Sequence, residues 1–135
     1  MRTIKFRGKE FDSGEWLLGA LVPNNKTYVC IAPFRKLLQL ERVNHETVGQ
    51  YIGILDKNGK EIYEGDIITV KGDYPRVVLW DKMMWALMPT VYYHDKDFWV
   101  MNLQHPGVDW WEEYADEIEV IGNIYDNPEM LSTLA

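Results

Sequence analysis

The chain has 135 residues, of which 47% are apolar and 13% aromatic. That length fits one domain, or one domain with a small appendage, and the apolar content suffices for a core. The single cysteine, Cys30, excludes an internal disulfide and a multi-cysteine zinc site. No apolar run approaches the ~20 residues of a membrane helix, and the N-terminus lacks the apolar core of a secretory signal. We therefore expect a cytoplasmic protein with no membrane partner.

The net charge of -7 is distributed unevenly along the chain. Residues 1–60 hold ten Lys/Arg and six Asp/Glu, a net of +4, whereas residues 61–135 hold four and fifteen, a net of -11. Phosphate binding depends on Lys and Arg, so the chain as a whole is a poor general nucleic-acid binder and only a local patch in its N-terminal half could serve. The densest acidic stretch, residues 109–119, is expected to form a solvated helix face.

Short segments rich in Val, Ile, Tyr and Trp, separated by turn residues, indicate a mainly β fold. In the first half of the chain, strands are predicted at 3–9, 16–22, 27–31, 48–54, 60–63 and 67–70. An Asn-Gly pair within 56–59 predicts a tight turn between two of them, because these residues tolerate positive φ. Residues 34–40 fit either a short helix or an irregular strand.

The second half continues as a meander and ends in helical turns. Strands are predicted at 76–80, 83–88, 90–93, 98–103 and 119–125. A helix is predicted near 109–116, because acidic residues in its first turn suit the helix dipole. Asn127 followed by Pro128 predicts one C-terminal helical turn. We expect a β hairpin region at 1–45 packed on a barrel-like β domain at 46–135.

Four segments together carry a family resemblance. They are residues 4–9, residues 14–19, residues 47–67, and residues 119–125 with the Asn-Pro-Glu at 127–129. In this order the chain closely resembles the YopX family of small phage and prophage proteins. The resemblance implies a mostly β fold with a small barrel in the C-terminal part, and a gene carried by a mobile element of a bacterial host. It implies no catalytic residue, because no agreed activity is attached to the family.

The residues themselves indicate no catalytic or metal centre. Nucleophilic catalysis needs a Ser or Cys beside a base, but Ser13 lies in a predicted turn, Ser132 near the C-terminus, and Cys30 in an apolar strand. The three histidines are scattered, whereas zinc needs three or four converging ligands. We predict that the protein is not an enzyme and uses no cofactor or metal.

The first functional hypothesis is a non-catalytic module that binds another protein or copies of itself. Its expected contact residues lie in the acidic, aromatic stretch near the C-terminus: Trp110, Trp111, Glu112, Glu113 and Glu117. Acidic surfaces complement basic partners and speed their encounter. A set of tryptophans in the second half could form a stacking platform for bases or sugars; they are Trp80, Trp85, Trp99, Trp110 and Trp111. Such platforms usually accompany a positive groove, so the negative charge here favours core packing or a subunit interface.

The alternative hypothesis is a nucleic-acid-binding small barrel. Lys5, Arg7 and Lys9 alternate with apolar residues along the predicted first strand, so their side chains share one face. Small barrels often bind oligonucleotides through such a face with nearby aromatic rings.

Overall fold

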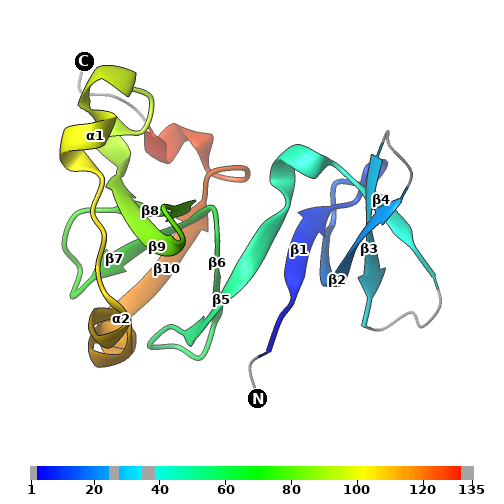
Figure 1. The fold of residues 1–135 in the computed structure, drawn as a ribbon, viewed down its shortest axis with the longest axis horizontal. Helices are drawn as coiled ribbons and strands as arrows, with labels where there is room; N and C mark the ends of the chain where they lie inside the picture. Colours follow the sequence, from blue (N-terminus) through cyan, green and yellow to red (C-terminus); the bar gives the residue numbers. More distant parts are fainter. Residues whose placement is uncertain (1–2, 25–27, 35–38, 132–135) are drawn as a thin grey trace. The chain divides into compact units, whose positions relative to one another are not determined.

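The structure, a computed structural model, describes residues 3–24, 28–34 and 39–131 (Figure 1). Ser132 and residues 35–38 of the ambiguous 34–40 segment therefore lie outside the described residues. The chain divides into two compact units, residues 1–53 and residues 54–135. Both consist mainly of antiparallel strands, which confirms the mainly β prediction.

The first unit is one antiparallel sheet with the strand order β4-β3-β2-β1-β5. Its elements are β1 (Phe6–Lys9), β2 (Trp16–Asn24), β3 (Tyr28–Pro33), β4 (Glu41–Val43), the short 3-10 helix η1 (His45–Thr47) and β5 (Gly49–Leu55). Within this unit Cys30, Ile31 and Val43 are buried. Cys30 lies buried in β3, in agreement with its placement in an apolar predicted strand. The end of β5 enters the second unit and pairs there with β6 (Glu61–Tyr63).

The second unit contains a four-stranded antiparallel sheet with the order β10-β7-β8-β9. These strands are β7 (Asp66–Val70), β8 (Arg76–Asp81), β9 (Met84–Pro89) and β10 (Ile118–Asn123). Between β9 and β10 the chain forms η2 (Thr90–Tyr92), η3 (Lys96–Phe98), α1 (Trp99–Asn102), α2 (Val108–Tyr114) and η4 (Ala115–Glu117); η5 (Pro128–Leu131) follows β10. The sheet is open, with β10 and β9 as its edges, so the small barrel that the family resemblance implied for the C-terminal part is not closed.

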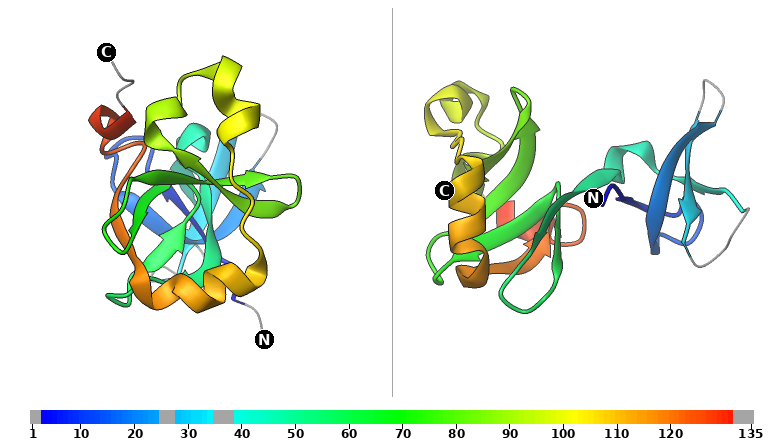
Figure 2. Two further views of the ribbon diagram at one scale, coloured as in Figure 1. Left: turned by 90° about the vertical axis from the view of Figure 1, so that its left-hand side faces the viewer. Right: turned by 60° about the horizontal axis from the view of Figure 1, so that its bottom comes forward.

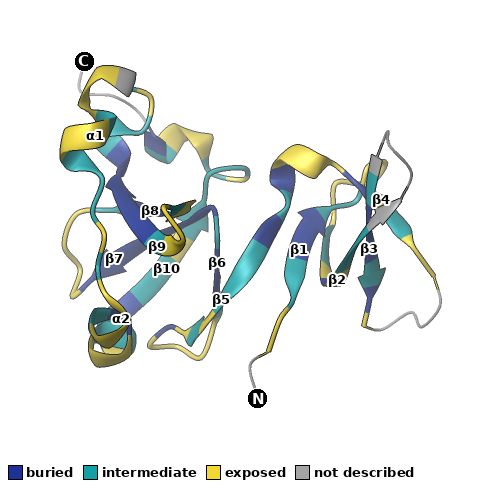
Figure 3. Cartoon of the chain, in the orientation of Figure 1, coloured by how far each residue is buried: buried dark blue, intermediate teal, exposed yellow. Residues whose placement is uncertain are grey.

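The core of the second unit lies on both faces of this sheet. Every residue of β7 is buried (Figure 3). Successive side chains of a strand point to opposite faces, so both faces of β7 are covered. Ile67 and Val77 cluster with Leu131 of η5, while α2 lies beside the sheet (Figure 2) and buries Trp111.

The helical predictions for the C-terminal part are confirmed, with one shift in boundary. The helix near 109–116 is present as α2 and η4, but it begins at Val108 after Gly107 as the N-cap, so Asp109 lies within its first turn. The predicted C-terminal turn is η5.

The predicted strands at 90–93 and 98–103 are wrong. These residues form η2, part of η3, and α1. Pro89 ends β9 and lacks the backbone N–H that a continuing strand needs. The indole of Trp99 then donates a hydrogen bond to the carbonyl of Tyr93 at 2.7 Å and holds the helical turns together.

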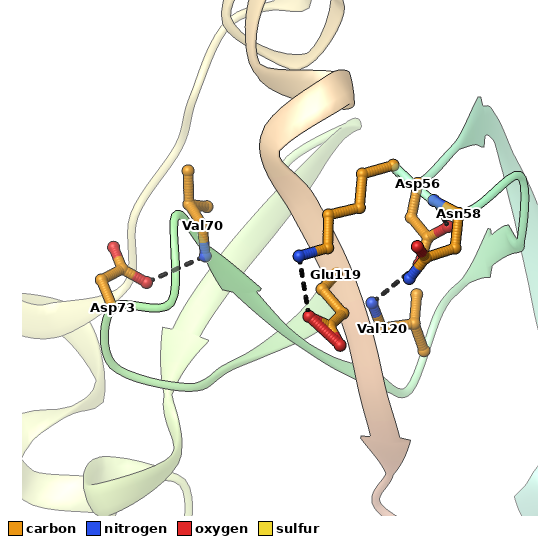
Figure 4. Close-up of polar contacts among 7 residues, drawn as sticks. Asp56, Asn58, Val70, Asp73, Glu119 and Val120 are labelled. Atoms are coloured by element: carbon orange, nitrogen blue, oxygen red, sulfur yellow. Dashed lines mark hydrogen bonds and ion pairs between the residues drawn. The ribbon is translucent and has the colours of Figure 1, made fainter.

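A buried carboxylate organises the turn between β5 and β6. Asp56 Oδ1 accepts hydrogen bonds from the backbone N–H groups of Asn58 and Lys60, at 2.8 and 2.9 Å. Its Oδ2 accepts from the backbone N–H of Val120 in β10, at 2.9 Å (Figure 4). One side chain therefore shapes the turn and ties it to a strand 64 residues away.

Two further contacts fix the same junction. The backbone N–H of Lys57 donates to the carbonyl of Ile118 at 2.8 Å. The Lys57 ammonium lies 3.0 Å from a carboxylate oxygen of Glu119. This ion pair is partly exposed, and such pairs contribute little, so the backbone bonds to Asp56 are the main restraint.

Candidate functional site

Helix α2 places the predicted protein-contact residues in different environments. Trp111 is buried at 4% exposure, Trp110 is half-buried, and Glu112 and Glu113 are exposed. The helical period of 3.6 residues explains the split, because one stripe of the helix faces the core while the opposite side faces water. No described residue forms an ion pair with either glutamate.

Two members of the predicted set, Trp111 and Glu117, are engaged within the second unit. Trp111 packs edge-on against Trp110, with ring centroids 5.2 Å apart. Glu117 lies in η4, where a carboxylate oxygen is 3.4 Å from the Lys71 ammonium. Glu112 and Glu113 are therefore the exposed members of the set, and Trp110 is half-buried.

A pocket of about 370 Å³ lies beside Trp110 and opens widely to solvent. We call it the Trp110 pocket; it is lined by Tyr74, Arg76, Leu87, Gln104, His105, Pro106 and Trp110. These residues come from the turn before β8, from β8 and β9, from the loop before α2, and from α2 itself. Sequence reasoning singled out only Trp110 as a binding residue, because no motif links such distant segments.

Arg76 forms the buried wall of the Trp110 pocket. It is 8% exposed, and its Nη2 donates to Asp73 Oδ2 at 2.7 Å. Asp73 also accepts the backbone N–H of Val70 at 2.9 Å (Figure 4), so the turn holds the carboxylate in place. The guanidinium stacks 4.1 Å from the ring centroid of Tyr74. Its Nε is buried and has no hydrogen-bond partner among the described residues.

Polar contacts fix the opposite side of the pocket. Gln104 Nε2 donates to the Tyr74 hydroxyl at 2.8 Å, across 30 residues of sequence. His105 Nε2 lies 2.7 Å from Asp81 Oδ2. The pocket thus combines two aromatic rings with side chains whose positions are set by hydrogen bonds.

The histidines are dispersed in the structure, as they are in the sequence. His45 lies in η1 of the first unit, His94 follows η2, and His105 pairs with Asp81. Within residues 3–24, 28–34 and 39–131, no group of three or more His, Cys, Asp and Glu could hold a metal ion.

Of the three predicted nucleic-acid contacts, Arg7 and Lys9 share one face of β1, and Lys5 immediately precedes this strand. The Lys5 ammonium is 5.1 Å from the Tyr51 ring centroid, and the Lys9 ammonium is 5.4 Å from that of Trp16. The Arg7 guanidinium is 4.6 Å from the Trp16 ring and is buried, at 7% exposure. Lys5 and Lys9 are half-buried. The structure therefore brings Arg7 and Lys9 together at the Trp16 ring, with Arg7 largely shielded from solvent.

Together these features define a small, mainly β protein with two units and a pocket lined partly by aromatic residues in the second. Comparison with known families matches residues 5–132 to the YopX protein family. The chain belongs to the YopX family, which confirms the resemblance seen in its four sequence segments.

The fold is similar to that of a solved structure, protein EF1440 from Enterococcus faecalis, with a TM-score of 0.54 and 20% sequence identity. The match covers 98% of this chain and 100% of that chain. At this identity the likeness concerns the fold alone. A search of curated proteins found no match. No described helix has the length and apolar character needed to cross a membrane.

Proposed function

We propose that this chain is a non-catalytic protein-binding module that binds a partner rich in Lys and Arg through α2 and the Trp110 pocket. The observation that carries the proposal is the pocket itself, which includes Trp110 of α2, the helix that also carries the exposed carboxylates Glu112 and Glu113. The resemblance of the chain to the YopX family supports a further part of the proposal. In this part, the protein is a phage- or prophage-encoded accessory protein that acts in the cytoplasm of a bacterial host.

The charge of the second unit supports a basic partner. Residues 54–135 contain six Lys/Arg and sixteen Asp/Glu, a net of -10. Complementary charge steers encounter and favours correct partners. A half-buried Trp within a pocket is a typical anchor of a protein interface, where a few aromatic residues carry most of the binding energy.

The side chains of the pocket support binding rather than chemistry. His105 is engaged by Asp81, and Arg76 by Asp73. The described residues that line the pocket include no Ser, Thr or Cys, the commonest hydroxyl and thiol nucleophiles.

A double charge reversal on α2 tests the proposed interface. Glu112→Lys with Glu113→Lys is expected to weaken binding to an identified, purified partner at least tenfold, because it opposes the partner's charge at the contact. Titration calorimetry at two salt concentrations measures the effect, which should shrink at high salt through screening. Analytical ultracentrifugation of the chain alone tests whether a second copy of this chain is itself the partner.

The matched control is Asp97→Lys with Glu129→Lys, which changes the net charge equally on η3 and η5. The control should leave the affinity of the partner nearly unchanged. Equal losses from both double variants would mean that overall charge, and not the α2 surface, governs binding, and would refute the proposed interface.

Nucleic-acid binding is a second candidate, favoured by the placement of Lys5, Arg7 and Lys9 beside two aromatic rings. Residues 1–53 hold eight Lys/Arg and five Asp/Glu, a net of +3. On this candidate, labelled oligonucleotides bind at ~50 mM salt, where phosphate contacts are strongest. Lys5→Gln with Lys9→Gln should reduce the salt slope by about 2, whereas Lys60→Gln with Lys82→Gln should not. An absence of binding at that salt rejects the candidate.

A further inference from the structure

We infer that the Trp110 pocket takes a proline-rich segment of the partner in the polyproline II conformation, flanked by Lys or Arg. This inference rests on the proposed function and specifies which kind of segment occupies the pocket. Polyproline II has no internal hydrogen bonds, so its carbonyl groups are open to donors and its rings to apolar walls.

The walls of the pocket suit proline rings. Tyr74 and Trp110 provide aromatic surface, and Leu87 and Pro106 add aliphatic surface between them. Tyr74 is 47% exposed, so its ring is accessible to a ligand. Proline-rich segments dock in aromatic-lined grooves because their backbone is already extended and loses little entropy on binding.

Donors at the same site suit the carbonyl groups of such a segment. Gln104 uses one N–H for the Tyr74 hydroxyl, and its amide carries a second. The indole N–H of Trp110 donates to no described residue. Arg76 also lines the pocket, but its Nε is covered by protein atoms and is not one of the donors that face a ligand.

The charge around the pocket decides against an anionic ligand. Asp73 neutralises Arg76 at 2.7 Å, and Asp81 lies 2.7 Å from His105. A phosphate or carboxylate would therefore meet a pocket without excess positive charge, in a unit with a net of -10. A neutral proline-rich segment fits the pocket, and flanking Lys or Arg fits the negative net charge of the unit.

The openness of the pocket favours an extended chain over a small molecule. Small-molecule sites bury most of their ligand's surface, whereas this pocket is wide towards solvent. An extended segment can cross such a site and continue beyond it, over a unit whose net charge is -10.

Titration of the full chain with two synthetic peptides, followed by ¹⁵N NMR, tests the inference. One peptide carries repeated Pro-x-x-Pro with flanking Lys and Arg, and the other has Ala at every Pro and the same charge. We expect the proline peptide to bind at least tenfold more tightly and to shift the signal of the Trp110 indole N–H. Tyr74→Ala should remove this preference. Trp80→Ala, which removes another aromatic ring of about half exposure on β8, should retain it.

Equal binding of the two peptides, or binding of neither, overturns the inference. Equal effects of Tyr74→Ala and Trp80→Ala overturn it as well. The proposed function is judged separately, by the Glu112→Lys and Glu113→Lys reversal against the identified partner. If the charge reversal weakens binding to the partner but the chain shows no preference for the proline peptide, the proposed binding function is retained and only the polyproline inference is rejected.

Discussion

Replacing Gly19 with alanine is expected to destabilise the first unit by about 3 kcal/mol or more, the upper range for overpacking. Gly19 in β2 lies opposite Pro33 in β3. A Cβ added at Gly19 would overlap the carbonyl oxygen of Ala32 and would lie 2.8 Å from its carbonyl carbon. These are backbone atoms, so no side chain can rotate away, and the two strands must separate.

Gly14→Ala in the same unit is the matched comparison. Gly14 has a φ of +73° and no atom within 4 Å of an added Cβ, so its substitution costs only the left-handed conformation, about 1–2 kcal/mol. Chemical denaturation gives the two losses of stability, and hydrogen exchange of the β2 and β3 amides locates them. Equal losses in the two variants would show that the strands absorb the methyl group at Gly19.

Local sequence patterns predicted the elements whose structure is determined locally. The Asn-Gly turn at 58–59 joins β5 and β6 as expected, since Gly59 adopts a φ of +78°. Asn127 likewise precedes the helical turn η5, and Pro128 begins it, because proline suits the first helical position. In both cases a few adjacent residues restrict the backbone enough to decide the outcome.

The wrong strand predictions, such as the one at 98–103, concern residues whose environment the sequence does not reveal. Val100 and Met101 suggested a strand, yet they are 90% and 81% exposed on α1. Strand propensity largely reflects packing on a half-buried surface, and here no such surface is available. Trp99 is the residue that anchors the turn, through a hydrogen bond to the Tyr93 carbonyl.

The candidate site was predicted only in part, for a similar reason. Acidic and aromatic residues marked α2, and the structure places Glu112 and Glu113 at its surface. The sequence could not tell that Trp111 is buried while its neighbour Trp110 borders a pocket. Nor could it place Tyr74 beside Gln104, because their contact depends on how β8 and the loop before α2 come together.

Asp56→Ala is expected to lower the stability of the second unit by about 2–4 kcal/mol, because buried backbone donors left without an acceptor are costly. The change removes the acceptor of three backbone N–H groups, those of Asn58, Lys60 and Val120. Asp56→Asn keeps a carbonyl oxygen and should lose less. Urea denaturation at neutral pH measures both variants.

The pH dependence of the stability of the second unit shows whether Asp56 acts as an ionised hydrogen-bond acceptor or only through packing. Burial raises the pKa of Asp56, but hydrogen bonds from the backbone of Val120, Lys60 and Asn58 outweigh it, so the pKa lies below the ordinary 3.8. The carboxylate's contribution is therefore complete above that ordinary value and is lost as the pH falls through the lowered pKa. The difference in stability between the wild type and Asp56→Asn should then narrow in strong acid. A difference that stayed constant from neutral pH into acid would contradict the ionised acceptor, because the asparagine variant cannot titrate at this position.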